Sequence, residues 1–369
     1  SLKKCYQCGT CSVACPMSPV SKPFPRKEML WASWGQKEKF MGDIDLWLCH
    51  NCGNCSDLCP RGADPAQLMS AGRNMIYQKL MPFPVIASWM GKLPGLIGLF
   101  LIPAILWLVV WGICAGAAGS WFPRTDGRIV FGAIFNGNYT IDPIFVLTFA
   151  FAVIVLWRGC VKLWKSFKPE GEILHIGPKK AWYVALLETL CEEVGTAKKF
   201  AECEGGPATG TPRADRRISH TMLVWSFCIL AFVTAIVALG HWGGYVIPAI
   251  LIETPMPQTF WVKILANIGA LLLLVSLFML TMRRIRLNPK HQKSGYYDWY
   301  LLGIIWAVAV TGVLTQAFRL MDCIHSAFVI YYLHLVVIWM FFAYAPWSKL
   351  GHFVYRTLAM VYVKMHGRN

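Results

Sequence analysis

The segment Cys5-Tyr-Gln-Cys8-Gly-Thr-Cys11-Ser-Val-Ala-Cys15-Pro16 recurs as Cys49-His-Asn-Cys52-Gly-Asn-Cys55-Ser-Asp-Leu-Cys59-Pro60. Each run holds three cysteines separated by two residues and a fourth cysteine that precedes a proline. This is the ligand spacing of two [4Fe–4S] clusters, in which the fourth cysteine of each run binds the other cluster. Structural zinc sites use pairs of cysteines for each ion, so the spacing disfavours zinc. We therefore expect one cluster on Cys5, Cys8, Cys11 and Cys59, and a second on Cys15, Cys49, Cys52 and Cys55.

The composition indicates a membrane protein with a water-soluble head. Hydrophobic residues make up 56% of the 369 residues and charged residues only 15%, which is too apolar for a soluble protein. Six stretches are long enough to cross a hydrocarbon layer of about 30 Å. They span residues 95–118, 141–164, 219–241, 259–282, 298–318 and 326–347. We predict an all-α protein with a ferredoxin-like two-cluster domain over 1–80, a proline-containing hinge over 81–94 and a six-span bundle over 95–369.

Basic residues indicate the orientation of these spans, because positively charged loops stay on the cytoplasmic side. The segments 165–218 and 283–293 and the tail after the last span are rich in Lys and Arg. With an even number of spans, we expect both termini and the cluster domain in the cytoplasm. The net charge of +16 then reflects topology and attraction to anionic lipids, and nothing supports binding of nucleic acid.

Three cytoplasmic stretches have an expected structure of their own. Residues 27–31 and 45–48 are predicted to form short helices that shield the metal from water. Residues 181–201 carry apolar side chains at helical spacing, which predicts an amphipathic helix on the membrane or on a partner. Residues 205–212 are rich in glycine and proline and are predicted to be a flexible linker.

Histidines near the spans are candidate haem ligands, because ionisable residues are costly in a bilayer and haem iron binds axial histidines. Along a continuous helix, about 31 Å separates His220 from His241, and about 27 Å separates His334 from His352. Because the two spans are antiparallel, we expect His220 to pair with His352 near the cytoplasmic face. His241 then pairs with His334 nearer the outer face, whereas His325 lies beyond the hydrocarbon layer. The alternative is that these are interfacial histidines with access to water.

Lys263 lies one short turn into the fourth span. Its ammonium group could donate a hydrogen bond to a quinone carbonyl beside the outer haem, or it could snorkel to the membrane surface. Six further cysteines show no ligand spacing and are expected to be small buried residues. They are Cys114, Cys160, Cys191, Cys203, Cys228 and Cys323.

With these residues in view, the chain resembles known families along its whole length. Residues 1–80, with both cysteine runs and Cys59-Pro-Arg61-Gly62, look like the small iron–sulfur component of heterodisulfide reductase. The remainder is similar to the cytochrome b component of that enzyme and to the gamma chain of respiratory nitrate reductase. Its matching motifs are Arg217-Ile-Ser-His220, Thr311-Gly-Val-Leu-Thr315, His334-Leu-Val and Ser348-Lys-Leu-Gly-His352. The fusion of the two parts is similar to the membrane component of the quinone-interacting membrane-bound oxidoreductase, Qmo.

This resemblance implies two [4Fe–4S] clusters, two haems b and a menaquinone site. His334 and His352 reproduce the spacing of two haem ligands in the nitrate reductase chain, and Lys263 resembles its quinone-interacting lysine. His220 and His241 are farther apart than in that family. The resemblance also implies cytoplasmic flavin and iron–sulfur subunits as partners, which connect to adenylylsulfate reductase.

The leading interpretation is a membrane subunit of a quinone-linked oxidoreductase complex. It would carry electrons between menaquinol, two haems b, two [4Fe–4S] clusters and cytoplasmic flavoproteins that serve adenylylsulfate reduction. One alternative is the same role in a heterodisulfide- or sulfite-reductase complex, and another is a haem-free ferredoxin tethered to the membrane. The chain has no adjacent Cys-Cys pair and no Gly-x-Gly-x-x-Gly fingerprint, so substrate chemistry is expected on another subunit.

Overall fold

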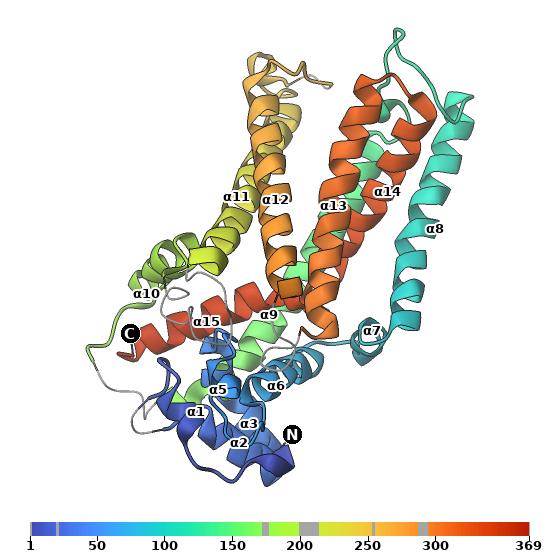
Figure 1. Cartoon of the computed structure of the whole chain (residues 1–369). Coiled ribbons are helices and arrows are strands. Elements are labelled where there is room, and N and C mark those ends of the chain that lie inside the picture. The colour runs from blue at the N-terminus through green and yellow to red at the C-terminus, as the bar shows by residue number, and fades with distance from the viewer. Residues whose placement is uncertain are drawn as a thin grey trace.

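The computed structural model describes residues 2–19, 22–171, 177–198, 214–252, 255–286 and 294–368. Within these ranges the chain is helical and forms no named β-strand, which confirms the predicted all-α class. A small head of short helices lies at one end of a bundle of long helices, and both termini lie at the head end (Figure 1).

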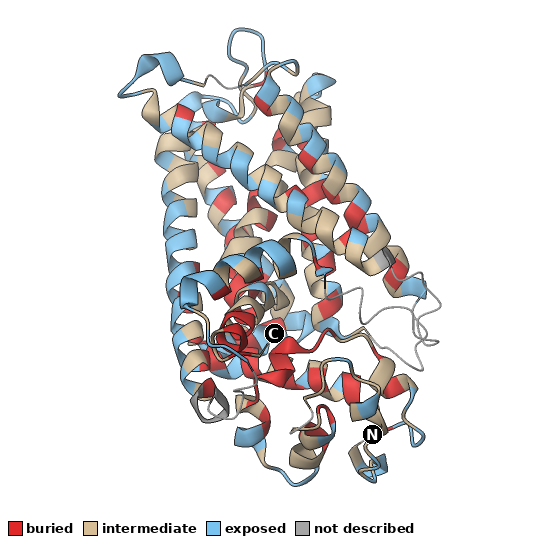
Figure 2. Ribbon diagram, turned by 90° about the vertical axis from the view of Figure 1, so that its left-hand side faces the viewer, coloured by how far each residue is buried: buried red, intermediate tan, exposed pale blue. Residues whose placement is uncertain are grey.

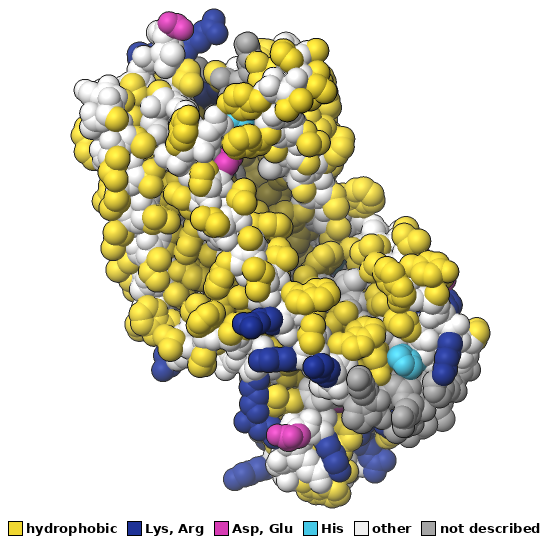
Figure 3. Space-filling model, turned by 180° about the vertical axis from the view of Figure 1, so that it is seen from behind, with side chains coloured by type: hydrophobic (Ala, Val, Ile, Leu, Met, Phe, Trp, Pro, Cys, Tyr) yellow, Lys and Arg dark blue, Asp and Glu magenta, His cyan; other side chains and the backbone are white. Residues whose placement is uncertain are grey.

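Six helices are long and apolar enough to cross a membrane, as predicted. They are α8 (Leu93–Ala118), α9 (Asp142–Gly171), α11 (Ala214–Gly243), α12 (Trp261–Arg286), α13 (Tyr296–Leu320) and α14 (Ile324–Ala343). Many residues along the bundle are exposed in the protein alone (Figure 2), and the surface there is largely hydrophobic (Figure 3). Exposed apolar side chains on long helices are suited to contact with lipid, so this is a multi-pass membrane protein.

The sixth span ends earlier than predicted. Helix α14 stops at Ala343, because Pro346 lacks a backbone N–H and its ring clashes with the preceding turn of a helix. The chain continues as η7 (Ala345–Trp347), η8 (Lys349–Gly351) and α15 (His352–Met365). Helix α15 lies crosswise between the bundle and the head (Figure 1). His334 and His352 therefore do not share a helix, and the separation calculated along one continuous helix is wrong.

The head is built from short helices around the two cysteine runs. They are η1 (Leu2–Lys4), α1 (Thr10–Val13), α2 (Arg26–Ser33), α3 (Lys37–Gly42), α4 (Asp45–Leu48), α5 (Asn54–Asp57) and the longer α6 (Pro65–Leu80). Helices α2 and α4 confirm the short helices predicted over 27–31 and 45–48. Helix α6 begins after Asp64, whose side chain accepts a hydrogen bond from the backbone N–H of Gln67 at 3.4 Å. Such a cap satisfies a backbone donor that the first helical turn leaves without a partner.

The head packs closely against the membrane part. The rings of Trp47, Tyr77 and Tyr355 meet at centroid distances of 5.4 to 6.0 Å and belong to one buried core. Helix α7 (Pro84–Met90) occupies the predicted hinge. Beside it, Trp347 Nε1 donates a hydrogen bond to the carbonyl oxygen of Pro82 at 2.8 Å. Buried residues gather at this junction (Figure 2), which therefore positions the head against α15.

The predicted amphipathic helix over 181–201 is present in part. It forms α10 (Trp182–Glu188) followed by the π-helical η4 (Thr189–Gly195), and it packs against α15. Residues 199–201 and the predicted linker over 205–212 lie outside the described residues. Three short turns complete the end of the bundle that lies opposite the head: η2 (Phe131–Ala133), η3 (Gly137–Ile141) and η6 (Pro248–Ile250).

Candidate redox site

The two cysteine runs fold into matching loops. Gln7 and Asn51 have φ angles of 63° and 53°, and Gly9 and Gly53 have φ angles of 86° and 92°. These are left-handed conformations, which glycine adopts without strain and asparagine tolerates. Each loop leads into a short helix, α1 or α5, and the two helices pack against each other. The repeat in the sequence is therefore also a repeat in the structure.

The first group of predicted ligands lies together at the surface of the head. Cys5, Cys8, Cys11 and Cys59 line one pocket, and Cys8 is exposed. Burial raises the pKa of the Cys11 thiol to about 11, and the neighbouring thiols contribute to this shift. The backbone N–H of Ala63 donates to Cys59 Sγ at 3.3 Å. Donors aimed at ligand sulfurs suit an iron–sulfur cluster, whose potential they help to set.

The second group is more deeply placed. Burial raises the pKa of the Cys15 thiol to about 12, with a contribution from the nearby thiols of Cys49 and Cys52. Burial likewise raises the pKa of Cys55, and the thiols of Cys49, Cys52, Cys15 and Cys11 contribute. The backbone N–H of Asn51 donates to Cys49 Sγ at 3.3 Å. The first four cysteines thus share one pocket, and the crossed ligation of the two clusters stays a prediction.

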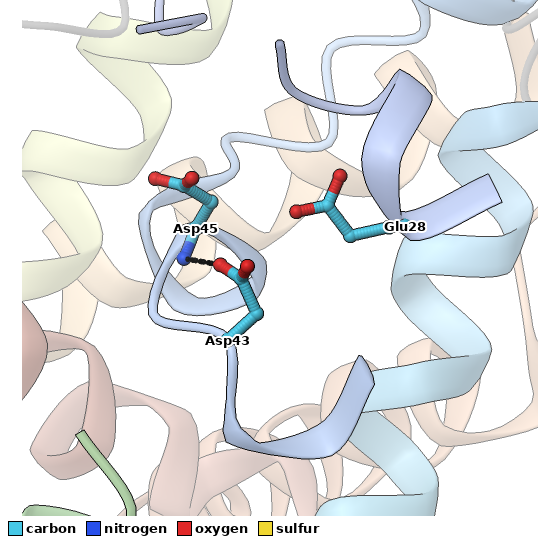
Figure 4. A group of neighbouring side chains, drawn as sticks. All are labelled: Glu28, Asp43 and Asp45. Carbon is cyan, nitrogen blue, oxygen red and sulfur yellow. Dashed lines mark hydrogen bonds between the residues drawn. The ribbon is translucent and has the colours of Figure 1, made fainter. Parts of the chain in front are cut away.

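Three buried carboxylates lie near the second group. Figure 4 shows Glu28, Asp43 and Asp45 facing one another, with the backbone N–H of Asp45 donating to Asp43 Oδ1 at 2.7 Å. The ammonium group of Lys27 lies 2.6 Å from carboxylate oxygens of Asp43 and Asp45 and 3.4 Å from Glu28. Arg368 Nη1 lies 2.5 Å from Asp45. Side-chain cations therefore already occupy the place that a metal ion would take, and we interpret this cluster as structural.

His220 of α11 and His352 of α15 lie near each other at the head end of the bundle. The pKa of His352 is lowered to about 3, first by burial and then by nearby cations, and His220 contributes. The Nδ1 atom of His352 pairs with the carbonyl oxygen of Lys349, whose ammonium group is paired with Asp298. A histidine held through Nδ1 presents Nε2, as metal-ligating histidines usually do. His352 is therefore oriented as a metal-ligating histidine is, and a haem on this pair stays a prediction.

His334 is held in a similar way in the middle of the bundle. Its Nδ1 lies 2.8 Å from Oγ1 of Thr311, and that hydroxyl donates to the carbonyl oxygen of Ala307 at 2.6 Å. The hydroxyl oxygen therefore accepts a hydrogen bond from Nδ1–H of His334, which leaves Nε2 without a proton and able to bind a metal. A Cβ atom at Gly312 would lie 2.9 Å from Cε1 of His334, so this glycine makes room for the imidazole ring. This environment also fits a haem ligand.

The structure does not bring His241 to His334. Nε2 of His241 lies 2.5 Å from Oδ1 of Asn138 in η3. The stacked rings of Phe227 and Phe341 set the relative height of α11 and α14. From this contact, His334 lies seven residues farther from the head and His241 fourteen, which is about 10 Å and about 21 Å along the helices. The two histidines therefore lie at different heights in this structure, and a haem shared by them stays a prediction.

Lys263 lies one helical turn from a group of hydrogen-bonded amides that sequence reasoning missed. It is half-buried near the N-terminal end of α12, close to Arg319 of α13. One turn farther along α12, Asn267 Nδ2 donates to Gln258 Oε1 at 3.3 Å. Gln316 of α13 donates to both Gln258 and Asn267, at 3.2 and 3.1 Å. Amides inside apolar spans are a signal in the sequence itself, because such groups are costly in lipid.

Three of the cysteines predicted to be buried are exposed instead. Cys191 lies on η4, Cys228 on α11, and Cys323 at the N-cap of α14. Cys228 stands on a span, where an exposed side chain faces lipid, and the other two lie outside the spans. Cys114 and Cys160 are partly buried, and Cys203 lies outside the described residues.

His50 connects the second cysteine group to α15, and it was also missed. Its side chain is buried, and its Nδ1 lies 2.6 Å from Nη2 of Arg356. His50 and Arg356 line a small cavity that the head shares with α15. Because Cys49 precedes His50 and His352 lies one turn before Arg356, this contact joins the two candidate sites.

An iron–sulfur head seated on a bundle of membrane helices defines a membrane electron-transfer protein. Residues 1–63 match the family model of a 4Fe-4S dicluster domain. Residues 91–369 match the model of the family Citrate utilization protein B; this match spans most of the chain, so the chain belongs to that family. Neither a curated protein nor a solved structure gives a significant match. The comparisons support the expected fusion of an iron–sulfur part with a membrane part, and they do not confirm the resemblance to Qmo.

Proposed function

We propose that this protein carries electrons between a soluble cytoplasmic redox enzyme and the quinone pool of the membrane. The contact between His50 and Arg356 carries the proposal. It places the buried cysteine group of Cys49 against α15, whose first residue is His352. The other cysteine group opens at the surface, where a soluble partner has access to it. The candidate sites thus follow one another from solvent to membrane.

A haem b held by His220 and His352 is part of this proposal. When bound, the clusters and the haem would accept and release single electrons. The protein contributes fixed ligands, because the Lys349 carbonyl orients His352 and the Lys349–Asp298 ion pair anchors η8. A second haem on His334 is the finer proposal, with His241 as the partner expected from the sequence.

The quinone site is proposed around Lys263. Three amides, Gln258, Asn267 and Gln316, join the ends of α12 and α13 beside it. Nε2 of Gln258 is buried and has no hydrogen-bond partner among the described residues. An apolar molecule with carbonyl oxygens, such as menaquinone, is suited to donors in a lipid environment. The alternative is a purely structural role, in which the amide hydrogen bonds hold α12 against α13.

The soluble partner is proposed to contain flavin and iron–sulfur groups. The resemblance to Qmo favours a partner that serves adenylylsulfate reductase. The family description, Citrate utilization protein B, favours a partner that serves citrate utilization instead. Since the family is assigned from most of the chain, we give the second partner precedence.

The reduced-minus-oxidised optical spectrum of the purified protein, with its haem and iron content, tests this proposal. We expect about eight non-haem irons and a b-type haem that is lost in His352→Ala. His325→Ala is the matched control, because His325 packs on Phe122 at the outer end and belongs to neither site. A preparation that contains iron and no haem would contradict our proposal and indicate a ferredoxin that is tethered to the membrane. A second haem that is lost only in His334→Ala would support the finer proposal.

The quinone site has a separate test. Lys263→Ala should slow haem reduction by menadiol at least tenfold while the haem spectrum stays unchanged, because a hydrogen-bond donor to the quinone is lost. Lys92→Ala, at an exposed position just before α8, should leave this rate unchanged. Equal rates of haem reduction in the two variants would show that Lys263 does not bind quinone and only extends its ammonium group to the membrane surface.

A further inference from the structure

Two cations lie on the exposed side of a membrane span. Arg158 and Lys162 are exposed on α9 and lie four residues apart, so their side chains share one face of the helix. Between Asp142 and Arg158 the helix carries no charged residue. Along α9, about 24 Å separates Asp142 from Arg158 and about 30 Å separates it from Lys162. The two cations therefore lie near the head-side boundary of a hydrocarbon layer about 30 Å thick.

An open cavity of about 590 Å³ lies beside these cations. Trp157, Arg158, Val161 and Lys162 of α9 line it on one side, and Pro82 lines it on the other. Volumes of roughly 300–1,000 Å³ are typical of sites for small ligands. Trp157 is exposed, and tryptophan is enriched at the depth where lipid headgroups meet the hydrocarbon. Among the described residues that line the cavity none is acidic, so its wall is apolar with cationic tips.

The far wall of the cavity belongs to the turn between α6 and α7, which packs closely against α9. Lys162 Nζ donates a hydrogen bond to the carbonyl oxygen of Leu80 at 3.4 Å. A Cβ atom at Gly159 would clash with Cε of Met81 and lie 2.5 Å from the hydroxyl oxygen of Tyr355. Helix α9 therefore meets this turn where the head joins the bundle. A ligand that contacts both would hold this junction together.

Membrane topology alone accounts for cations at the head end, and Figure 3 shows Lys and Arg gathered where the bundle meets the head. Topology does not explain why two of them line one apolar cavity together with a tryptophan. At headgroup depth, the anion that basic pockets between spans bind is a lipid phosphate. Leu147 and Ile154 are exposed on the same face of α9 as Arg158, so acyl chains have an apolar surface next to the cavity.

We propose that this cavity binds one anionic phospholipid. Arg158 and Lys162 bind its phosphate, Trp157 packs beside the headgroup, and the acyl chains lie along α9 toward Ile154. The bound lipid joins α9 to the turn at Pro82. Because a ligand that binds only the folded state stabilises that state, the lipid stabilises the junction between the head and the bundle.

The test measures the melting temperature of the purified full chain in detergent, with phosphatidylglycerol or phosphatidylcholine added, and counts retained lipids by native mass spectrometry. The wild-type protein should retain one phosphatidylglycerol per chain and melt at a higher temperature with this lipid than with phosphatidylcholine. The double variant Arg158→Gln with Lys162→Gln should bind phosphatidylglycerol more weakly, by about fivefold for each cation removed. The lipid-dependent rise in melting temperature should shrink accordingly.

Two controls separate a specific site from general charge attraction. The double variant Lys92→Gln with Arg286→Gln changes the net charge by the same amount. Both residues are exposed beside the head-side ends of α8 and α12, and neither lines the cavity, so this variant should respond to phosphatidylglycerol as the wild type does. Inorganic phosphate alone should not raise the melting temperature, because a free anion has no acyl chains to bury.

Three results would overturn the inference. Equal stabilisation of the wild type and the Arg158→Gln, Lys162→Gln variant by phosphatidylglycerol would show that the cavity does not bind the lipid. An equal loss in the control variant would assign the effect to surface charge in general, and an equal rise with inorganic phosphate would indicate a site for a soluble anion. If the double variant fails to fold, Arg158→Gln alone decides, since it keeps the hydrogen bond from Lys162 to Leu80.

Discussion

At the scale of single residues, Gly312 controls the space around His334. Gly312→Ala would place a Cβ atom 2.9 Å from the imidazole, so the ring must move and the haem proposed there should be lost or spectrally shifted. Gly303→Ala in the same helix is the control, because nothing lies within 4 Å of its Cβ. That control should be neutral or stabilise the protein by about 0.5 kcal/mol. Identical optical spectra and melting temperatures for the two variants would contradict the role of Gly312.

Lys27 holds the buried carboxylates of the head. Lys27→Met should destabilise the head by roughly 3–5 kcal/mol, because buried acidic groups lose their partner. Burial, with help from Asp45, raises the pKa of Asp43 to about 6 from 3.8. Folded Asp43 thus binds its proton more tightly than unfolded Asp43, so its contribution to stability falls as pH rises from about 4 to about 6. The variant should therefore lose more stability at pH 8 than at pH 6.

Thermal melting and iron retention at these two pH values measure the effect of Lys27→Met. Lys39→Met is the control, since Lys39 is exposed on α3 and should change neither quantity. If Lys27→Met melts at the same temperature as the wild type, Arg368 alone is enough to offset the negative charge of the carboxylates.

At the scale of elements, the packing of α1 against α5 predicts reciprocal effects of two cysteine variants. Cys59→Ser should damage the cluster of Cys5, Cys8 and Cys11, because Cys59 lies in their pocket. Cys15→Ser should damage the other cluster. Each variant should keep about four of about eight irons, and paramagnetic resonance of the reduced protein tells the clusters apart. Damage to the cluster of the variant's own run would show that each run binds its own cluster.

The sequence predicted those elements whose pattern is local. The repeated cysteine spacing predicted two matching segments, and the apolar lengths predicted all six spans. It did not predict that α14 ends before Pro346, because prolines also occur inside spans, as Pro103 does in α8. The position of α15 depends on contacts such as Trp47 with Tyr355, far apart in the chain. The contact of Arg356 with His50 was missed for the same reason, whereas the amides near Lys263 were a signal that the sequence already held.

At the scale of the whole molecule, charge and apolar surface divide along one axis. Lys and Arg gather at the head end, while hydrophobic side chains cover much of the bundle (Figure 3). Both termini lie at the head end (Figure 1). Since positive segments stay inside, this distribution favours a cytoplasmic head, and a soluble partner there would reach the pocket of Cys8.

Two natural cysteines report on this orientation. Cys191 lies exposed on η4 at the head end, and Cys323 lies exposed between α13 and α14 at the opposite end. A membrane-impermeant maleimide should label Cys323 and spare Cys191 in intact spheroplasts, because only the outer end contacts the reagent. Permeabilised membranes should label both, and Cys191→Ser and Cys323→Ser identify each signal. Cys228 faces lipid and should stay unlabelled. Labelling of Cys191 in intact spheroplasts would place the cluster head outside, where a cytoplasmic partner has no access to it.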